Sequence, residues 1–361
     1  MNLFKITIAS FVLICSCRSS ISQKGESQFY EKIERDPGET IVYPDEHWTY
    51  SSPENFGYSI EAFKGVKKKF EAIGGEAMIV VKNGYVIASF GDVEVPIPNF
   101  SIRKSFLNSL LGMEYDKGNL NLKASLTSLG MDDRENLTSM EKNATIEQLL
   151  RASSGVYHPA NHESSRQKND RPPRGSHKPG DFFYYNNWDF NALGSIYMQE
   201  SGNDLFEAFR ANIAEKIGMQ DFSVKNTKYE NGSSSKHPAY TFKTSARDDA
   251  RFGLLYLNKG KWNDESLLSE EWINKSLSLQ ATTGEAWYYD YGYLWWVDTR
   301  NNMFMARGKS GQYIALLPNE NMVIVFRADP GSIIREWIGT RVKPQESMRL
   351  ILQVLNAKKN D

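Results

Sequence analysis

The feature that most constrains the fold of this chain is a change in hydrophobic periodicity along its 361 residues. Apolar residues recur at helical spacing from Ile60 to Ile73, and the run AMIVVKNGYVIASFG follows directly. That run is apolar on both sides of Asn83 and Gly84, and Asn-Gly between two apolar runs is typical of a hairpin turn. The sequence therefore predicts that the fold begins with a helix and two paired strands.

The end of the chain returns to sequence that is typical of strands. Four short apolar runs are separated by turn residues, namely YGYLWWVD, MFMARG, QYIALLP and MVIVFRA, and a helical pattern runs from Gln345 to about Asn356. Between the two ends, over about residues 106–282, the periodicity is mostly helical. We therefore predict an α+β fold in which an antiparallel sheet, made from about 46–105 and 283–361, contains a helical insertion.

The first residues have the composition of an export signal. Residues 1–5 form a short basic start and residues 6–14 an apolar core that is too short to span a bilayer. We interpret residues 1–16 as a signal peptide. Its end, LICSCR, resembles that of a bacterial lipoprotein signal, which implies that Cys17 is lipidated; an ordinary cleaved signal is the alternative.

The segment after the signal predicts a tether. Residues 17–45 are rich in Ser, Lys, Glu and Gln, as expected of a flexible connection to a folded domain at 46–361. Both cysteines precede this domain, so it has no intramolecular disulfide and no thiol nucleophile. The formal net charge of −1 gives no reason to expect nucleic acid as a partner. We expect an extracytoplasmic protein, periplasmic or at the outer membrane, that a lipid anchors to a bacterial membrane.

Ser101 and Lys104 stand three residues apart where the polar sequence changes into an apolar, helix-spaced one. The same spacing also occurs in three polar segments, at Ser139/Lys142, Ser165/Lys168 and Ser233/Lys236. Only the run after Ser101, FLNSLLG, would bury a helix and so hold a serine and a lysine on one face of its first turn. This pair is therefore the candidate for chemistry.

A serine hydroxyl becomes a nucleophile when a base lies close to it. A lysine amine can serve as that base when burial or another cation lowers its pKa. The N-terminus of a helix also offers free backbone N–H groups to a developing oxyanion. The alternative is that Ser101 caps the helix and that Lys104 is solvated.

Two later segments add polar groups in an ordered context. In FFYYNNWDFNALG, Tyr185 and Asn187 are two residues apart, which would point them the same way in an extended loop. In ARGKSGQYIALLP, Lys309 and Ser310 stand at the predicted start of a strand, between glycines that permit close approach of a ligand. The alternative for Tyr185 is that it only packs among its aromatic neighbours. The alternative for Lys309 and Ser310 is that they only form a hairpin turn.

Three ordered elements, Ser101-Ile102-Arg103-Lys104, Tyr185-Asn186-Asn187 and Lys309-Ser310-Gly311, resemble the Ser-x-x-Lys, Tyr-x-Asn and Lys-Thr/Ser-Gly motifs of one family. This family contains the serine hydrolases related to class C β-lactamases and penicillin-binding proteins. The similarity covers about residues 75–330 and implies a β-lactamase/transpeptidase-like fold. The middle motif has Asn186 where the family carries Ser or Ala, and no glutamate of the class A kind is identified.

The resemblance implies a role for each of these residues. Ser101 would be the nucleophile, Lys104 its proton acceptor, and Tyr185 a partner in proton transfer to the leaving group and from the deacylating water. Asn187 would orient a substrate amide or hold Lys104. Lys309 would keep Tyr185 acidic or bind a substrate carboxylate. Ser310 and Gly311 would complete the substrate site, and the backbone N–H groups of Ser101 and Gln312 would form the oxyanion hole.

The implied activity is hydrolysis of a small ester, amide or peptide through an acyl-enzyme, with no cofactor and no metal. His158 and His162 have helical spacing, but Pro159 disfavours the helix that would align them on a metal. Relatives also include esterases, amidases, D-peptidases and non-catalytic binding proteins, so the substrate stays open. The alternative function is a penicillin-binding-like receptor of cell-wall fragments with little or no turnover.

The lipid anchor can be tested by one substitution. Cys17→Ser should move the protein from the membrane fraction to the soluble fraction, because the acyl chains that hold the tether at the membrane would be missing. Cys15→Ser is the matched control and should stay with the membrane. Soluble wild-type protein with an unmodified Cys17 would contradict the prediction.

Overall fold

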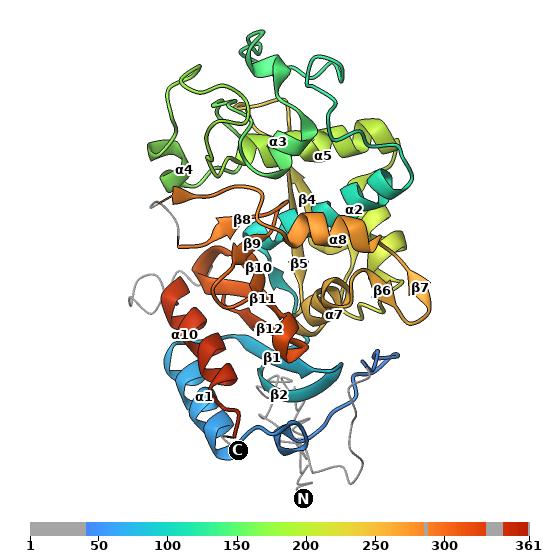
Figure 1. Cartoon of the computed structure of the whole chain (residues 1–361), viewed down its shortest axis with the longest axis vertical. Helices are drawn as coiled ribbons and strands as arrows, with labels where there is room; N and C mark the ends of the chain where they lie inside the picture. Colours follow the sequence, from blue (N-terminus) through green and yellow to red (C-terminus); the bar gives the residue numbers. More distant parts are fainter. Residues whose placement is uncertain (1–40, 285–287, 330–341, 360–361) are drawn as a thin grey trace, which may run out of the picture.

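The computed structural model describes residues 41–284, 288–329 and 342–359 (Figure 1). The proposed signal peptide, Cys17 and residues 17–40 of the proposed tether lie outside these ranges. Within them, no helix is long and apolar enough to cross a membrane.

One antiparallel sheet of seven strands joins the two ends of the chain, in the order β2-β1-β12-β11-β10-β9-β8. The strands are β1 (Ala77–Lys82), β2 (Tyr85–Gly91), β8 (Asp290–Tyr291), β9 (Trp296–Asp298), β10 (Met303–Gly308), β11 (Gln312–Leu317) and β12 (Met322–Arg327). Strand β1 pairs with β2 through the predicted Asn83-Gly84 turn, and with β12 on its other side. The predicted hairpin and the α+β class are thereby confirmed.

Helices cover both faces of this sheet (Figure 1). Helices α1 (Ile60–Ala72) and α10 (Pro344–Leu355) pack against each other, and Phe70 of α1 meets Phe326 of β12 with ring centroids 6.0 Å apart. Helix α7 (Ala246–Leu257) lies on the opposite face. Its approach is so close that a Cβ at Gly253 would lie 2.6 Å from the side chain of Val323. Only glycine fits there without a shift.

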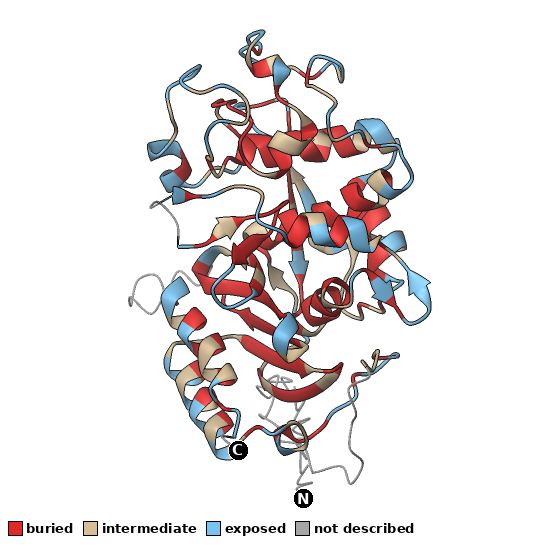
Figure 2. Ribbon diagram, viewed as in Figure 1, coloured by how far each residue is buried: buried red, intermediate tan, exposed pale blue. Residues whose placement is uncertain are grey.

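Helices predominate among the regular elements between the sheet segments, although less than half of the residues there are helical, and this part holds much of the buried core (Figure 2). Its other helices are α2 (Arg103–Asp116), α3 (Ile146–Leu150), α4 (Ser165–Asn169), α5 (Asn187–Ser201), α6 (Leu205–Phe209) and α8 (Glu270–Leu277). It also contains strands that the periodicity did not indicate: β3 (Ile97–Pro98), β4 (Thr227–Glu230), β5 (Ala239–Thr244), β6 (Lys261–Trp262) and β7 (Glu265–Ser266). Strands β3, β6 and β7 have two residues each and β4 has no fully buried residue, so these four carry little alternation. Strand β5 has six residues with an alternating burial pattern, a signal that the prediction missed.

The run YGYLWWVD does not form one strand, in contrast to the prediction. It is divided into β8 and β9 by residues 292–295, which turn away from the sheet. The N–H of Tyr293 donates to the Ser276 carbonyl at the end of α8, and the N–H of Leu294 donates to the Leu150 carbonyl at the end of α3. Carbonyls at a helix end have no N–H from a following turn to accept. These two accept from Tyr293 and Leu294 instead, and the strand is interrupted there.

A buried ion pair links the sheet to the segment before Ser101. Arg327, the last residue of β12, pairs with Asp249 of α7, and both side chains are fully buried. The guanidinium also donates to the carbonyls of Ile97, at 2.8 Å, and Pro98. Asp249 accepts a 2.5 Å hydrogen bond from Thr244, whose hydroxyl accepts one from Asn99. Residues 97–99 are therefore held from two sides.

Arg327→Met should destabilise the protein by about 3–5 kcal/mol, because it leaves the Asp249 carboxylate buried without its partner. The measurement is urea unfolding. Lys64→Met, which removes a solvent-exposed pair with Glu61, is the control and should cost less than about 1 kcal/mol. Equal effects of the two substitutions would contradict the role of the buried pair.

Candidate active site

Ser101 lines a cavity and does not cap α2. Ser101 lies in a short 3-10 turn, Phe100–Ile102, and α2 begins at Arg103. The residue at the cap of α2 is Ile102, which makes no side-chain cap bond, so the capping alternative is wrong. Phe100 has φ +50°, an uncommon conformation for a bulky residue. It directs the chain so that Ser101 faces a cavity.

Lys104 is the hydrogen-bond partner of the nucleophile. Its Nζ lies 2.8 Å from Ser101 Oγ, and the side chain is only 2% exposed. The amine sits over the rings of Tyr185, at 4.9 Å, and Phe190, at 4.8 Å. Burial, with a further contribution from the charge of Arg103, holds the pKa of Lys104 well below its usual value. Lys104 is therefore suited to accept a proton near neutral pH.

Tyr185 lies on the other side of the nucleophile, to which it is hydrogen-bonded. Burial raises the pKa of Tyr185, while the hydrogen bond to Ser101 and the charges of Arg103 and Arg307 act in the opposite direction. The expectation of an acidic Tyr185 is therefore wrong in its direction. Its hydroxyl keeps its proton and is suited to act as an acid. The cations that act on it are the two arginines and not Lys309.

Asn187 begins α5 and lines the cavity. Its amide donates a 2.7 Å hydrogen bond to the carbonyl of His162. Its Oδ1 is buried and has no hydrogen-bond partner among the described residues. Since Lys104 is bound to Ser101 and Asn187 to His162, the expected contact between Asn187 and Lys104 is not present. The free oxygen instead fits the alternative role, acceptance of an N–H from a substrate.

The segment Lys309–Gly311 is a 3-10 turn between β10 and β11, and not the predicted start of a strand. Ser310, with φ +60°, and Gly311, with φ +72°, both adopt left-handed conformations that reverse the chain. The hairpin alternative therefore describes the backbone correctly. Nevertheless Lys309 and Ser310 line the cavity, so the turn is also part of the site. The Lys309 side chain is exposed, 5.8 Å from the ring of Phe100.

Gln312, whose backbone N–H the resemblance assigns to the oxyanion hole, is the first residue of β11. Its side chain is fully buried and donates to the carbonyls of Pro98 and Ala328. At Gly308, which pairs with Gln312, a Cβ would lie 2.8 Å from the carbonyl oxygen of Asn99, so this end of the β10–β11 pair lies close to the segment before Ser101. The role of the Gln312 backbone N–H in an oxyanion hole stays a prediction.

The cavity has a volume of about 690 Å³, and the loop 158–181 forms a wall of it that sequence reasoning left without a role. Residues 162–164, Arg166, Gln167 and Asp170 line it from this loop. Gln167 donates to the backbone carbonyl of Tyr185 at 3.1 Å, so the loop also supports the candidate acid. The prolines and charges of this segment disfavour regular structure, yet it contains the short helix α4, and its composition gives no sign of its position at the cavity.

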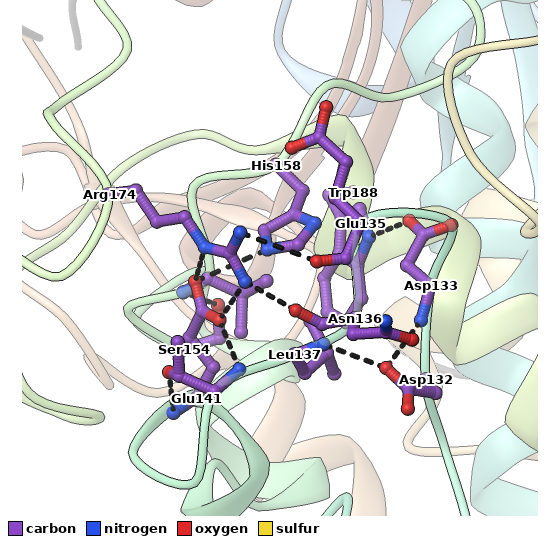
Figure 3. Close-up of polar contacts among 12 residues, drawn as sticks. Asp132, Asp133, Glu135, Asn136, Leu137, Glu141, Ser154, His158, Arg174 and Trp188 are labelled. Atoms are coloured by element: carbon purple, nitrogen blue, oxygen red, sulfur yellow. Dashed lines mark hydrogen bonds and ion pairs between the residues drawn. The ribbon is translucent and has the colours of Figure 1, made fainter.

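A buried carboxylate fixes this loop in place (Figure 3). Glu141 is fully buried between His158, at 3.3 Å, and Arg174, at 2.9 Å. Burial alone would raise the pKa of Glu141, but the hydrogen bonds from His158 and Arg174 hold it well below its usual range. Nearby, the indole of Trp188 in α5 donates to Asp133 at 2.6 Å. His158 therefore has a structural partner.

The comparisons with known proteins agree with this geometry. The family model described as beta-lactamase matches residues 64–328. Protein flp of Staphylococcus aureus is 24% identical over 336 residues, which cover 80% of this chain and 67% of that protein.

Solved structures of similar fold include a penicillin binding protein from Bacillus halodurans, with a TM-score of 0.58 and 18% identity, covering 80% of this chain and 99% of that one. The octameric penicillin-binding protein homologue from Pyrococcus abyssi has a TM-score of 0.61 and 17% identity. The match covers 83% of this chain and 77% of that one. The fold and the match over residues 64–328 lead to one conclusion: this chain belongs to the beta-lactamase family.

Proposed function

We propose that this protein is a serine hydrolase that cleaves an ester or amide through an acyl-enzyme on Ser101. The observation that carries the proposal is the 2.8 Å contact between Ser101 Oγ and the buried amine of Lys104. A neutral amine at that distance is a base for the hydroxyl. Family membership supports this reading, since serine hydrolysis is common among proteins of this fold.

In the acylation step, Ser101 Oγ attacks the substrate carbonyl while its proton moves to Lys104 Nζ. The negative charge that develops on the carbonyl oxygen is stabilised by the backbone N–H groups of Ser101 and Gln312. The Tyr185 hydroxyl gives its proton to the leaving alcohol or amine as the bond to the carbonyl carbon breaks. A proton transfer from Lys104 to Tyr185 then restores both groups.

Deacylation uses the same groups with water in place of the serine. Lys104 takes a proton from the water, whose oxygen bonds to the acyl carbon, and Tyr185 returns a proton to Ser101 Oγ as the acid product leaves. A proton transfer from Lys104 to Tyr185 again restores both groups. The free Oδ1 of Asn187 is placed to accept an N–H of an amide substrate. We further propose that the enzyme acts outside the cytoplasm, held to a bacterial membrane through Cys17.

Covalent labelling tests the nucleophile. A fluorophosphonate should add one label to the wild-type protein and none to Ser101→Ala, measured by intact mass. Ser109→Ala is the matched control, because Ser109 lies in α2 and its hydroxyl only donates to the carbonyl of Phe106. This control should be labelled like the wild type. Labelling without turnover of any ester or amide would favour the receptor, and labelling of Ser101→Ala would contradict the assignment.

The lysine base gives a pH-dependent prediction. kcat/KM should fall as the pH decreases through the lowered pKa of Lys104, because the protonated amine cannot accept the serine proton. Lys104→Arg should be nearly inactive, since a guanidinium keeps its proton. An active Lys104→Arg variant would show that another group is the base.

Lys104→Met should be inactive yet more stable to urea than the wild type. Because folding lowers the pKa of Lys104, the unfolded chain binds more protons between the two pKa values, and wild-type stability falls as the pH decreases through that window. The difference in free energy of unfolding between Lys104→Met and the wild type should therefore be larger at pH 7 than at pH 10. A less stable Lys104→Met at both pH values would mean that the amine supports the fold.

A further inference from the structure

Arg103, the first residue of α2, occupies one of the two unspecified positions of the Ser-x-x-Lys motif and lines the cavity beside Lys104. Both residues are only 2% exposed. The guanidinium of Arg103 lies 4.2 Å from the ring centroid of Tyr240 on β5, and its Nη2 donates a 3.0 Å hydrogen bond to Asn191 Oδ1 on α5. Its Nη1 is buried and has no hydrogen-bond partner among the described residues. A cation is therefore fixed next to the candidate base.

Other buried arginines of this chain have partners of another kind. Arg327 pairs with the carboxylate of Asp249. Arg251 donates to backbone carbonyls, among them that of Ile217 at 2.9 Å. Neither arginine lines the cavity. In the part of the chain that the structure describes, Arg103 has an amide oxygen and an aromatic ring as partners, and no carboxylate pairs with it.

The uncharged forms of the neighbouring ionisable groups are favoured around Arg103 and Lys104. Burial raises the pKa of each of the three tyrosines that face this pair, which are Tyr185, Tyr240 and Tyr291. Partial burial, together with the charges of the pair and of Lys309, lowers the pKa of His162 below its usual value. These hydroxyls therefore keep their protons near neutral pH, and the imidazole is neutral there.

The carboxylates nearest to these groups are engaged elsewhere. Glu230 on β4, whose charge acts on His162, pairs with Lys228 at 3.1 Å. Asp189 on α5 accepts a 2.6 Å hydrogen bond from Ser154, and burial raises the pKa of its carboxyl well above the usual value. Within the described residues, the two adjacent basic side chains at the start of α2 thus have no counter-ion.

We propose that Arg103 is a positioning residue that keeps the amine of Lys104 free of a proton before catalysis. Two adjacent buried side chains without a counter-ion cannot both carry a positive charge at moderate cost. A guanidinium does not give up its proton in a protein, whereas a buried amine does. The proton is therefore lost from Lys104. The proposal rests on the proposed function, in which Lys104 is the base, and adds the group that sets the protonation of this base.

The same charge favours the step that follows proton uptake. Once Lys104 has taken the serine proton, its ammonium lies beside the guanidinium of Arg103, and the repulsion favours transfer of the proton onward to Tyr185. Asn191 and Tyr240 hold the guanidinium in place while this charge appears and disappears. Arg103 acts through Lys104 and needs no contact with the substrate.

The test is the pH dependence of fluorophosphonate labelling, which reports the activation of Ser101 and needs no turnover. Arg103→Met removes the charge and keeps an unbranched side chain in the buried position. The half-rate pH, at which the labelling rate falls to half its plateau, should rise by at least about one unit, as expected when one of two neighbouring charges inside a protein is removed. Arg103→Gln, which is also uncharged but can still bond to Asn191, should show the same rise.

Two control variants separate the charge of Arg103 from its packing and from the net charge of the protein. Arg103→Lys keeps the charge and loses the planar guanidinium, so the half-rate pH should stay close to that of the wild type. Lys64→Met deletes a solvent-exposed charge and should not move it. A loss of labelling rate that is equal at every pH in Arg103→Met and Arg103→Gln, or a shift of the same size in either control, would overturn the proposal.

If the wild type is not labelled, the hydrolase proposal fails, and urea unfolding decides the role of Arg103. The difference in free energy of unfolding between Lys104→Met and its parent should grow as the pH decreases and become constant below the pKa of Lys104 in the folded protein. In an Arg103→Met background, it should become constant at a higher pH. The same pH in both backgrounds would overturn the proposal.

Discussion

The buried contact between Arg327 and Asp249 is the interaction on which the arrangement of the molecule depends. It joins the last residue of β12 to α7 on one face of the sheet, and its remaining donors reach the carbonyls of residues 97–98. These residues lead directly into the nucleophile turn. Two charges without solvent are tolerated only when hydrogen bonds satisfy them, and Thr244 and Asn99 complete that set. The position of Ser101 is thus tied to the sheet.

The candidate active site contains several features that each lower the stability of the fold. An amine in an aromatic environment lowers stability, and so does the left-handed backbone at Phe100 and Ser310. The surrounding core compensates for both. Burial lowers the pKa of Lys104 and raises that of Tyr185 within one small volume, so the surroundings move the pKa values of a candidate base and a candidate acid apart.

Local signals account for what the sequence could predict. The hairpin at Asn83-Gly84, the helix that ends before Gly74 and the apolar run after Ser101 are each specified by a few adjacent residues. What it could not predict depends on contacts between distant segments. Nothing adjacent to Arg307 shows that three rings from separate segments of the chain lie beside it.

The same reason explains the error at the third motif. The motif indicates which residues lie near the site, but the turn at Lys309–Gly311, in place of a strand start, follows from how β10 and β11 pair. The direction of the Tyr185 pKa likewise follows from how completely the surrounding core excludes water, which neighbouring residues in the chain do not reveal. Motifs of adjacent residues thus indicated which residues lie near the candidate site. The pKa shifts there depend on how distant segments pack around it.

The pairing of β1 with β12 has a consequence for how the chain folds. Strand β1 is apolar along most of its length and buried on both faces, yet one of its hydrogen-bonded edges is completed only by the last strand of the sheet. Until Met322–Arg327 has been synthesised, that edge stays open, and contacts of such long range form slowly. The sheet of a chain with this topology is completed only after its last strand has been synthesised.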